Sequence, residues 1–209
     1  MALLYRAELR PDKLDLLNAW LPTRPWYRGP EEPELRRVAA YRFDDPAGEV
    51  GVETFVVRAG DGPLLHVPLT YRGAPLDGAD RWLVGTTEHS VLGRRWVYDG
   101  CADPVYAGTL ATAIRTGGGQ ADEFLEIDGK LQRRRPTTFV TGSGNDEAGA
   151  VAVGAVVRVE DGDPTLIVTD SGSLAVLRIL DDAADAGERA VLTGTWTDRS
   201  SPVLLAYEN

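Results

Sequence analysis

Three short runs of alternating polar and apolar residues, joined by tight turns, constrain the fold of this chain more than any other feature. They cover residues 35–43, 50–58 and 65–71, and the turns between them read Asp44-Asp-Pro-Ala-Gly48 and Gly60-Asp-Gly-Pro63. A period of two is typical of strands with one buried face, and Asp, Gly and Pro clusters are typical of turns. Because parallel neighbours need a long crossover, links this short predict an antiparallel meander.

The alternation also assigns side chains to the faces of that sheet. In the second run Phe55 and Val57 fall together, and in the third His66 faces away from the other apolar residues. The residues expected to share a face are Leu35, Arg37, Ala39, Tyr41 and Phe43 in the first run, and Leu65, Val67, Leu69 and Tyr71 in the third.

A helix is predicted before the meander. Leu14, Leu17 and Leu21 recur at helical spacing after Asp12, which suits an N-cap, and Pro22 ends the pattern. We expect this helix to lie on the apolar face of the meander.

A second helix is predicted after the meander, beyond one or two further strands in residues 82–98. It begins at Asp103-Pro104, an N-cap followed by proline at the first helical position, and stops at Gly117-Gly-Gly119. Its expected apolar stripe is Tyr106, Leu110, Ala113 and Ile114.

The glycine run divides the chain into two predicted domains, residues 1–117 and 118–209. The second is expected to be almost entirely β, so the fold class is α+β. Its candidate strands cover residues 124–127, 137–141, 151–160, 165–169, 173–180, 190–197 and 203–207.

Charge and composition exclude several classes of function. The net charge is −10, which repels phosphate backbones and disfavours nucleic acid as a partner. One cysteine and two histidines favour neither a disulfide nor a metal site, and we expect no cofactor. No apolar run approaches the ~20 residues of a membrane span, and no signal peptide is recognisable, so we expect a cytoplasmic protein.

The densest set of chemically unusual residues lies between residues 82 and 106. Together with two aromatic residues that look exposed in the loop after the first helix, it forms the candidate ligand or partner surface. Aromatic side chains gathered on one surface would suit the apolar face of a sugar or a partner protein. The candidate residues are Trp26, Tyr27, Glu88, His89, Trp96, Tyr98, Asp99 and Cys101.

Each of these residues also has a plainer interpretation. Glu88 and His89 are adjacent and suit a structural hydrogen-bond pair better than a catalytic dyad. Cys101 precedes a helix N-terminus, which would lower the pKa of its thiol, but a small buried residue is the simpler role. Asp99 and Asp103 could act as an acid/base pair, although Asp103 already suits a helix cap.

No motif predicts a catalytic residue. Gly142-Ser-Gly144 lacks the Gly-Lys-Ser/Thr of a phosphate-binding loop, and no serine has G-x-S-x-G surroundings. The dense basic run Arg133, Arg134 and Arg135 could dock an anion, or it could be the solvated edge of a hairpin.

Several segments of the first half resemble the N-terminal cap domain of actinobacterial maltokinases. The match is carried by residues 87–93, Thr-Glu-His-Ser-Val-Leu-Gly, then by Arg95-Trp-Val-Tyr-Asp99 and Asp103-Pro-Val. Leu21-Pro22 and the segment from Arg24 to Tyr27 resemble the opening of that family. The resemblance covers residues 1–117 and implies a cystatin-like helix on an antiparallel sheet, followed by a subdomain like a kinase N-lobe.

The second half departs from that family. The family pattern has a lysine near Val176 for ATP phosphates, but the two lysines of this chain are Lys13 and Lys130. No His-x-Asp catalytic loop is present, and 209 residues of this pattern do not supply the (β/α) barrel of a glucan branching enzyme.

The resemblance therefore implies a stand-alone, pseudokinase-like cap protein of α-glucan, maltose or trehalose metabolism. It would act without catalysis, by binding a ligand or another protein of that metabolism. The alternative is a sugar-binding protein or an enzyme with a site around residues 88–101, and a homo-oligomer also stays open.

Overall fold

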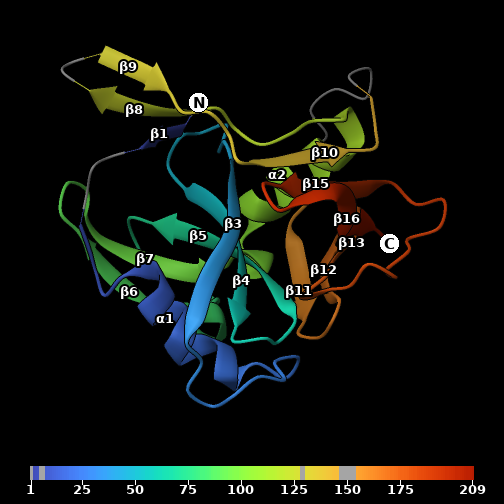
Figure 1. Ribbon diagram of the computed structural model, residues 1–209, viewed down its shortest axis with the longest axis horizontal. Helices are drawn as coiled ribbons and strands as arrows, with labels where there is room; N and C mark the ends of the chain where they lie inside the picture. The colour runs from blue at the N-terminus through green and yellow to red at the C-terminus, as the bar shows by residue number, and fades with distance from the viewer. Residues whose placement is uncertain (1, 5–7, 128–129, 146–153) are drawn as a thin grey trace.

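The structure is a computed structural model that describes residues 2–4, 8–127, 130–145 and 154–209 (Figure 1). Its main layers follow one another in the order α1, a seven-stranded sheet, α2 and a six-stranded sheet. One buried cluster joins α1 to the near face of the seven-stranded sheet. A second cluster joins the opposite face of that sheet to α2 and the six-stranded sheet. The mixed, mostly antiparallel architecture confirms the predicted fold class.

The seven-stranded sheet contains the predicted meander. Its strands run in the order β2-β6-β7-β5-β4-β3, and β14 adds to β5. All pairings in this sheet are antiparallel, as expected from the short turns. The strands are β2 (Leu9–Arg10), β3 (Leu35–Phe43), β4 (Gly51–Ala59), β5 (Leu64–Arg72), β6 (Leu83–His89), β7 (Gly93–Asp99) and β14 (Ile179–Leu180).

Helix α1 (Lys13–Trp20) covers this sheet as predicted. Asp12 caps it, and Asp15 closes a capping box by accepting from the backbone N–H of Asp12. Leu16, Leu17 and Trp20 are buried on the apolar face of the sheet. That face also holds Phe55, Val57, Leu65, Val67 and Leu69, which confirms the predicted faces of β4 and β5. The short 3₁₀ helix η1 (Leu21–Thr23) continues α1 and carries Pro22.

The predicted face of β3 is wrong for part of the strand. The register of β3 against β4 shifts between Arg37 and Ala39, where a β-bulge inserts an extra residue. A bulge reverses the alternation, so Leu35 lies on the α1 face while Ala39, Tyr41 and Phe43 lie on the α2 face. Period-two reasoning fails here because it assumes an uninterrupted ladder.

Helix α2 (Pro104–Thr116) lies between the two large sheets. Asp103 caps its N-terminus, and Gly117 ends it in the left-handed conformation with φ 68°. The predicted stripe is buried: Tyr106, Leu110, Ala113 and Ile114 all belong to the central cluster. The 3₁₀ helices η2 (Asp80–Trp82) and η3 (Gly100–Ala102) lie before β6 and before α2.

The six-stranded sheet accounts for most strands predicted in the second half, and its order is β10-β15-β16-β13-β12-β11. Residues 151–153 of the predicted strand 151–160 lie outside the described residues. The predicted strand 173–180 is broken, because β13 ends at Val176 and the next residues cross to the other large sheet. The strands are β10 (Thr138–Gly142), β11 (Val156–Glu160), β12 (Thr165–Thr169), β13 (Gly172–Val176), β15 (Val191–Trp196) and β16 (Arg199–Glu208).

A small third sheet of β1 (Ala2–Leu4), β8 (Glu123–Ile127) and β9 (Lys130–Arg133) was only partly predicted. Lys130 begins β9, which pairs with β8 in antiparallel orientation, and β1 runs parallel to β8. Strands on either side of the predicted boundary at residue 117 therefore pair with each other in two places, β1 with β8 and β14 with β5.

Asp103 has two roles at the start of α2, and both are measurable. Its carboxylate accepts from the backbone N–H of Val105 at 2.9 Å and from both Nε and Nη2 of Arg72 at 2.6 and 2.7 Å. Asp103→Ala should lower the free energy of unfolding by about 2–4 kcal/mol, because a cap and a buried charge-assisted pair are lost together.

The matched control is Asp12→Ala, which removes a more exposed cap and should cost about 1 kcal/mol. Urea denaturation of both variants checks the difference. An equal loss at the two positions would mean that the Arg72 pair contributes nothing.

Candidate functional site

Most of the predicted ligand surface is inside the protein. The described structure buries five of its eight residues: Trp26 is 3% exposed, Tyr27 8%, Tyr98 1%, and Asp99 and Cys101 are fully buried. The expectation that Trp26 and Tyr27 are exposed is therefore wrong. Both fold back into the core under α1, and the indole Nε1 of Trp26 donates to Asp161 at 2.9 Å.

The remaining three residues lie at or near the surface around the β6–β7 hairpin. Glu88 is exposed and accepts from Nε of Arg94 at 2.7 Å. The Nδ1 atom of half-buried His89 accepts from the backbone N–H groups of Val91 and Leu92 at 3.2 and 3.1 Å. These contacts shape the hairpin turn and leave Glu88 and His89 with separate partners. Half-buried Trp96 packs on the cluster formed by Trp82 and Tyr98.

Asp99 forms a buried ion pair that the sequence did not predict. The Nη2 atom of Arg178 lies 2.6 Å from its Oδ2 atom, and both side chains are fully buried. The guanidinium also donates from Nε to Thr165 at 2.7 Å and lies over the Trp26 ring, 5.1 Å from its centroid. Burial lowers the pKa of Arg178, but several neighbours oppose this effect, foremost the Asp99 carboxylate, and the pKa is raised overall.

The two acidic residues considered as an acid/base pair are engaged separately. Asp99 pairs with Arg178, and Asp103 pairs with Arg72. Each carboxylate therefore neutralises its own arginine. Cys101 lies between them and is fully buried, and burial raises the pKa of its thiol well above the ordinary value. A thiol with that pKa is a poor nucleophile.

A second buried polar pair lies next to Arg178. His66 on β5 is fully buried, with Nδ1 2.9 Å from the backbone oxygen of Leu177 and Nε2 2.9 Å from the Tyr41 hydroxyl. Because a carbonyl only accepts, Nδ1 carries the proton and Nε2 accepts from Tyr41. Burial lowers the pKa of His66 to about 4, and the charge of Arg178 acts in the same direction.

The basic run at the end of β9 is exposed and partly paired. Arg133 contacts Asp122, and Nη1 of Arg134 lies 3.2 Å from Glu123. Arg134 and Arg135 also line a hollow beside β3. This placement is compatible with both interpretations of the run, as the edge of a hairpin and as an anion site, and both stay predictions.

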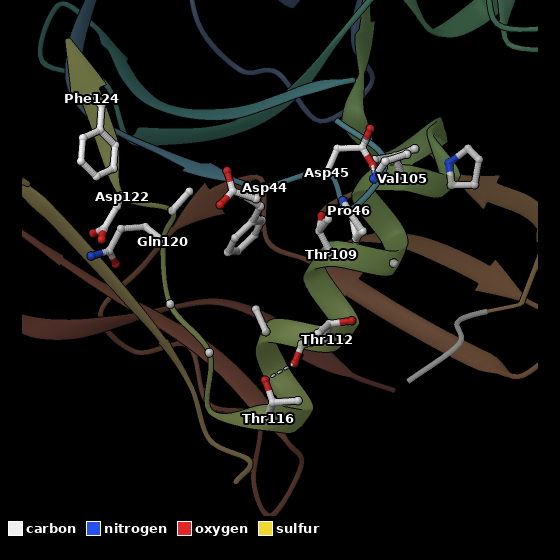
Figure 2. Close-up of a pocket in the computed structure, with 18 residues that line it drawn as sticks. Asp44, Asp45, Pro46, Val105, Thr109, Thr112, Thr116, Gln120, Asp122 and Phe124 are labelled. Atoms are coloured by element: carbon white, nitrogen blue, oxygen red, sulfur yellow. Dashed lines mark hydrogen bonds between the residues drawn. The ribbon is translucent and has the colours of Figure 1, made fainter. Parts of the chain in front are cut away.

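A large concave site lies along one side of α2. It is a cleft of about 1080 Å³ between α2, the turn after β3 and the segment 118–124 (Figure 2). We call it the α2 cleft. Figure 2 shows Gln120, Asp122 and Phe124 on one side, Asp45, Pro46 and Val105 on the other, and a row of threonines along the helix.

The lining of the α2 cleft is rich in hydrogen-bond acceptors. Thr109, Thr112 and Thr116 follow helical spacing and share one face of α2. The hydroxyls of Thr109 and Thr116 donate to carbonyls of their own helix at 3.0 and 2.8 Å. Their lone pairs remain to accept from a ligand.

Carboxylates add to this character. Asp44, Asp45 and Asp122 line the α2 cleft, and none of its described lining residues is Lys, Arg or His. Asp45 is held rigidly, because it accepts from three backbone N–H groups of the turn after β3, at 2.8–3.0 Å. Gln120 is held by accepting from the backbone N–H of Val140 at 2.8 Å, so its amide group is left to donate.

Gly108 is a feature of α2 that packing does not explain. A glycine inside a helix costs about 1 kcal/mol relative to alanine. A Cβ built at Gly108 would meet nothing within 4 Å, so neither close packing nor a positive φ requires glycine there. It lies on the wall of the α2 cleft, where its lack of a side chain keeps the cleft open.

Sequence reasoning missed this cleft, although a weak signal was present. A glycine followed by threonines at positions 109, 112 and 116 gives α2 a small, polar stripe opposite its apolar stripe. Such a stripe is also typical of an ordinary solvated helix face. The tertiary structure makes it a cleft by bringing Asp44, Asp45 and the segment 118–124 beside it.

The described parts of the chain contain no group of three or more His, Cys, Asp or Glu residues that could hold a metal ion. Within the same residues, no helix has both the length and the apolar character needed to cross a membrane.

Comparison with known protein families identifies the segment that contains the sheet. Residues 20–103 match the model of the maltokinase N-terminal cap domain. The match runs from the end of α1 to the N-cap of α2 and includes β3 to β7. Residues 20–103 are therefore similar to a maltokinase N-terminal cap domain, and this match supports the resemblance recognised in the sequence. A comparison with curated proteins found no match.

The ion pair of Asp99 and Arg178 predicts a large, non-additive effect on stability. Arg178→Met should lower the free energy of unfolding by about 3–5 kcal/mol, because the Asp99 carboxylate is left buried without its partner. Adding Asp99→Ala should recover part of that loss, since neither charge is then unpaired. A double-mutant cycle in urea measures the coupling, and purely additive losses would contradict it.

His66 predicts a pH dependence. Its pKa is about 4 in the folded protein and near 6.5 when exposed, so the unfolded state binds the proton first as the pH falls. Stability should therefore decrease between pH 6.5 and 4, with a contribution of about 3 kcal/mol from this residue. Urea denaturation of the wild type and His66→Gln across this range checks the sign. Parallel pH profiles for the two proteins would show that His66 does not contribute.

Proposed function

We propose that this chain is a non-catalytic cap-like protein of maltose, α-glucan or trehalose metabolism that binds a neutral sugar in the α2 cleft. The observation that carries the proposal is the lining of this cleft, which combines three carboxylates and a row of threonines with no cationic side chain. The similarity of residues 20–103 to the maltokinase N-terminal cap domain supports the link to this metabolism.

The volume of the α2 cleft and the hydrogen-bonding groups that line it suit a sugar. Small-molecule sites usually measure about 300–1,000 Å³, so a cleft of about 1080 Å³ is large enough for more than a single small group. Each sugar hydroxyl donates and accepts, and the cleft offers acceptors on Asp44, Asp45 and the threonines as well as a donor on Gln120. Phe124, on one side of the cleft in Figure 2, offers an apolar surface to the C–H face of a ring.

The same lining argues against phosphorylated ligands. A phosphate group would approach Asp44, Asp45 and Asp122 without a basic side chain in the lining to compensate for the repulsion. We therefore favour unphosphorylated glucans such as maltose or longer oligomers over sugar phosphates and nucleotides.

The proposal is non-catalytic because the lining holds no activated group. Its described side chains include no thiol, imidazole or amine. Asp45 already accepts from three backbone N–H groups, and Asp122 pairs with Arg133. Neither carboxylate is placed as a general acid.

Partner binding is the second candidate function. Val91 and Leu92 at the tip of the β6–β7 hairpin are 58% and 43% exposed. They lie beside Glu88, the exposed remainder of the surface predicted from the sequence. A partner protein of the same metabolism would dock here without occupying the α2 cleft.

Gly108 provides the test. Gly108→Leu should place a side chain in the α2 cleft and raise helix stability by about 0.5–1 kcal/mol, because Gly is replaced by a good helix former. Isothermal titration with maltose, maltotriose and trehalose should show binding to the wild type and a loss of about tenfold or more in the variant. Glucose 6-phosphate should not bind.

Gly108→Ala is the matched control. Its Cβ points into open space, so it should gain helix stability and keep the sugar affinity. If the wild type binds none of the sugars, or if Gly108→Leu binds them unchanged, the α2 cleft is not a sugar site. Capture of the same partner by the wild type and Gly108→Leu, but not by Leu92→Asp, would favour the second candidate.

A further inference from the structure

A second hollow, of about 420 Å³, lies across the segment 120–122 from the α2 cleft, and that segment lines both sites. We call it the basic pocket, because its lining has the opposite charge character. Five cationic side chains line it, together with the carboxylates of Glu53, Asp122 and Glu123. The cationic residues are Lys13, Arg37, Arg42, Arg134 and Arg135.

The bulge in β3 creates this concentration of charge. In a regular strand Arg37 and Arg42 would point to opposite faces, because they are an odd number of residues apart. The extra residue between Arg37 and Ala39 turns both toward the α1 face, where Arg37 pairs with Val57 in register and Arg42 with Glu53. Lys13, from α1, points toward the same site.

Two of the three carboxylates of the basic pocket each contact two cationic side chains. Glu53 contacts both Lys13 and Arg42, and Glu123 contacts both Arg42 and Arg134. The third carboxylate, Asp122, contacts Arg133 outside the pocket.

Two arginines therefore carry uncompensated charge. Among the residues that the structure describes, no carboxylate lies within ion-pair distance of Arg37 or Arg135. In a protein of net charge −10, this is a local excess of positive charge.

A buried donor points to the same conclusion. The Nε atom of Arg42 is buried and lacks a hydrogen-bond partner, since the nearest Glu123 oxygen is 3.5 Å away. Buried N–H groups without a partner are rare because they cost free energy.

The pKa of Lys13 also reflects the positive charge around the basic pocket. Burial, with a further effect from Arg42 and Arg37, lowers this pKa, although the Glu53 carboxylate opposes the shift.

We propose that the basic pocket binds the phosphate group of a small metabolite, with Arg37 and Arg135 supplying the charge and Arg42 a buried donor. Guanidinium groups recognise phosphate through paired, charge-assisted hydrogen bonds, which suits these three of the four arginines that line the pocket. The volume accommodates a phosphate together with part of the molecule that carries it. This site does not depend on sugar binding in the α2 cleft.

Inorganic phosphate is the probe that tests the proposal. Isothermal titration at constant ionic strength, set with sodium chloride, should show saturable binding to the wild type. Arg37→Gln combined with Arg135→Gln should weaken this binding about tenfold or more, because two charged donors are lost. Both side chains are exposed, so the thermal midpoint without phosphate should hardly change.

Arg81→Gln combined with Arg94→Gln is the matched control, since it removes the same charge outside the basic pocket. It should leave the phosphate affinity within about twofold of the wild type, because exposed charges at a distance are screened. Equal weakening by both double variants would show a general charge effect and overturn the site. Absence of saturable phosphate binding to the wild type would overturn it as well. Maltose affinity should be the same in both double variants, which separates this result from the fate of the α2 cleft.

Discussion

The buried pair of Asp99 and Arg178 is the interaction on which the rest of the structure depends. An unpaired ion is very costly inside a protein, so each of these side chains requires the other to be in place. Asp99 ends β7 in the cap domain, and Arg178 lies between β13 and β14. The pair therefore forms only when the two halves of the chain are folded against each other.

Several neighbouring features follow from the position of Arg178. Its backbone N–H donates to Asp163 at 2.8 Å, and its carbonyl accepts from the backbone N–H of His66 at 2.8 Å. These two hydrogen bonds hold the segment in which the chain leaves the six-stranded sheet and pairs with β5. The guanidinium covers the Trp26 ring, which draws that loop inward. Asp99, one of the candidate site residues in the sequence, thus helps to join the two sheets through a buried polar layer.

Both candidate sites border the segment between α2 and β8. The segment 118–124 follows α2 and leads into β8, where the sequence suggested a domain boundary. In the structure it separates the acceptor-rich α2 cleft from the basic pocket. Ligand sites commonly form where two packed units meet, because neither unit alone closes the hollow. A neutral sugar and a phosphate would then occupy adjacent sites of opposite charge.

The sequence by itself determined the local elements and the resemblance to the maltokinase cap domain. Capping residues, turn residues and periodicity identified both helices, the meander and most later strands, because these signals act over a few neighbouring residues. They could not identify the bulge after Arg37, the crossing at Arg178 or the burial of Trp26. Those depend on partners far along the chain: Val56 and Val57 for the bulge, Asp99 for Arg178 and Asp161 for Trp26. The candidate sites were decided only by the tertiary structure, since Gly108 and Arg37 become informative once packing shows what lies beside them.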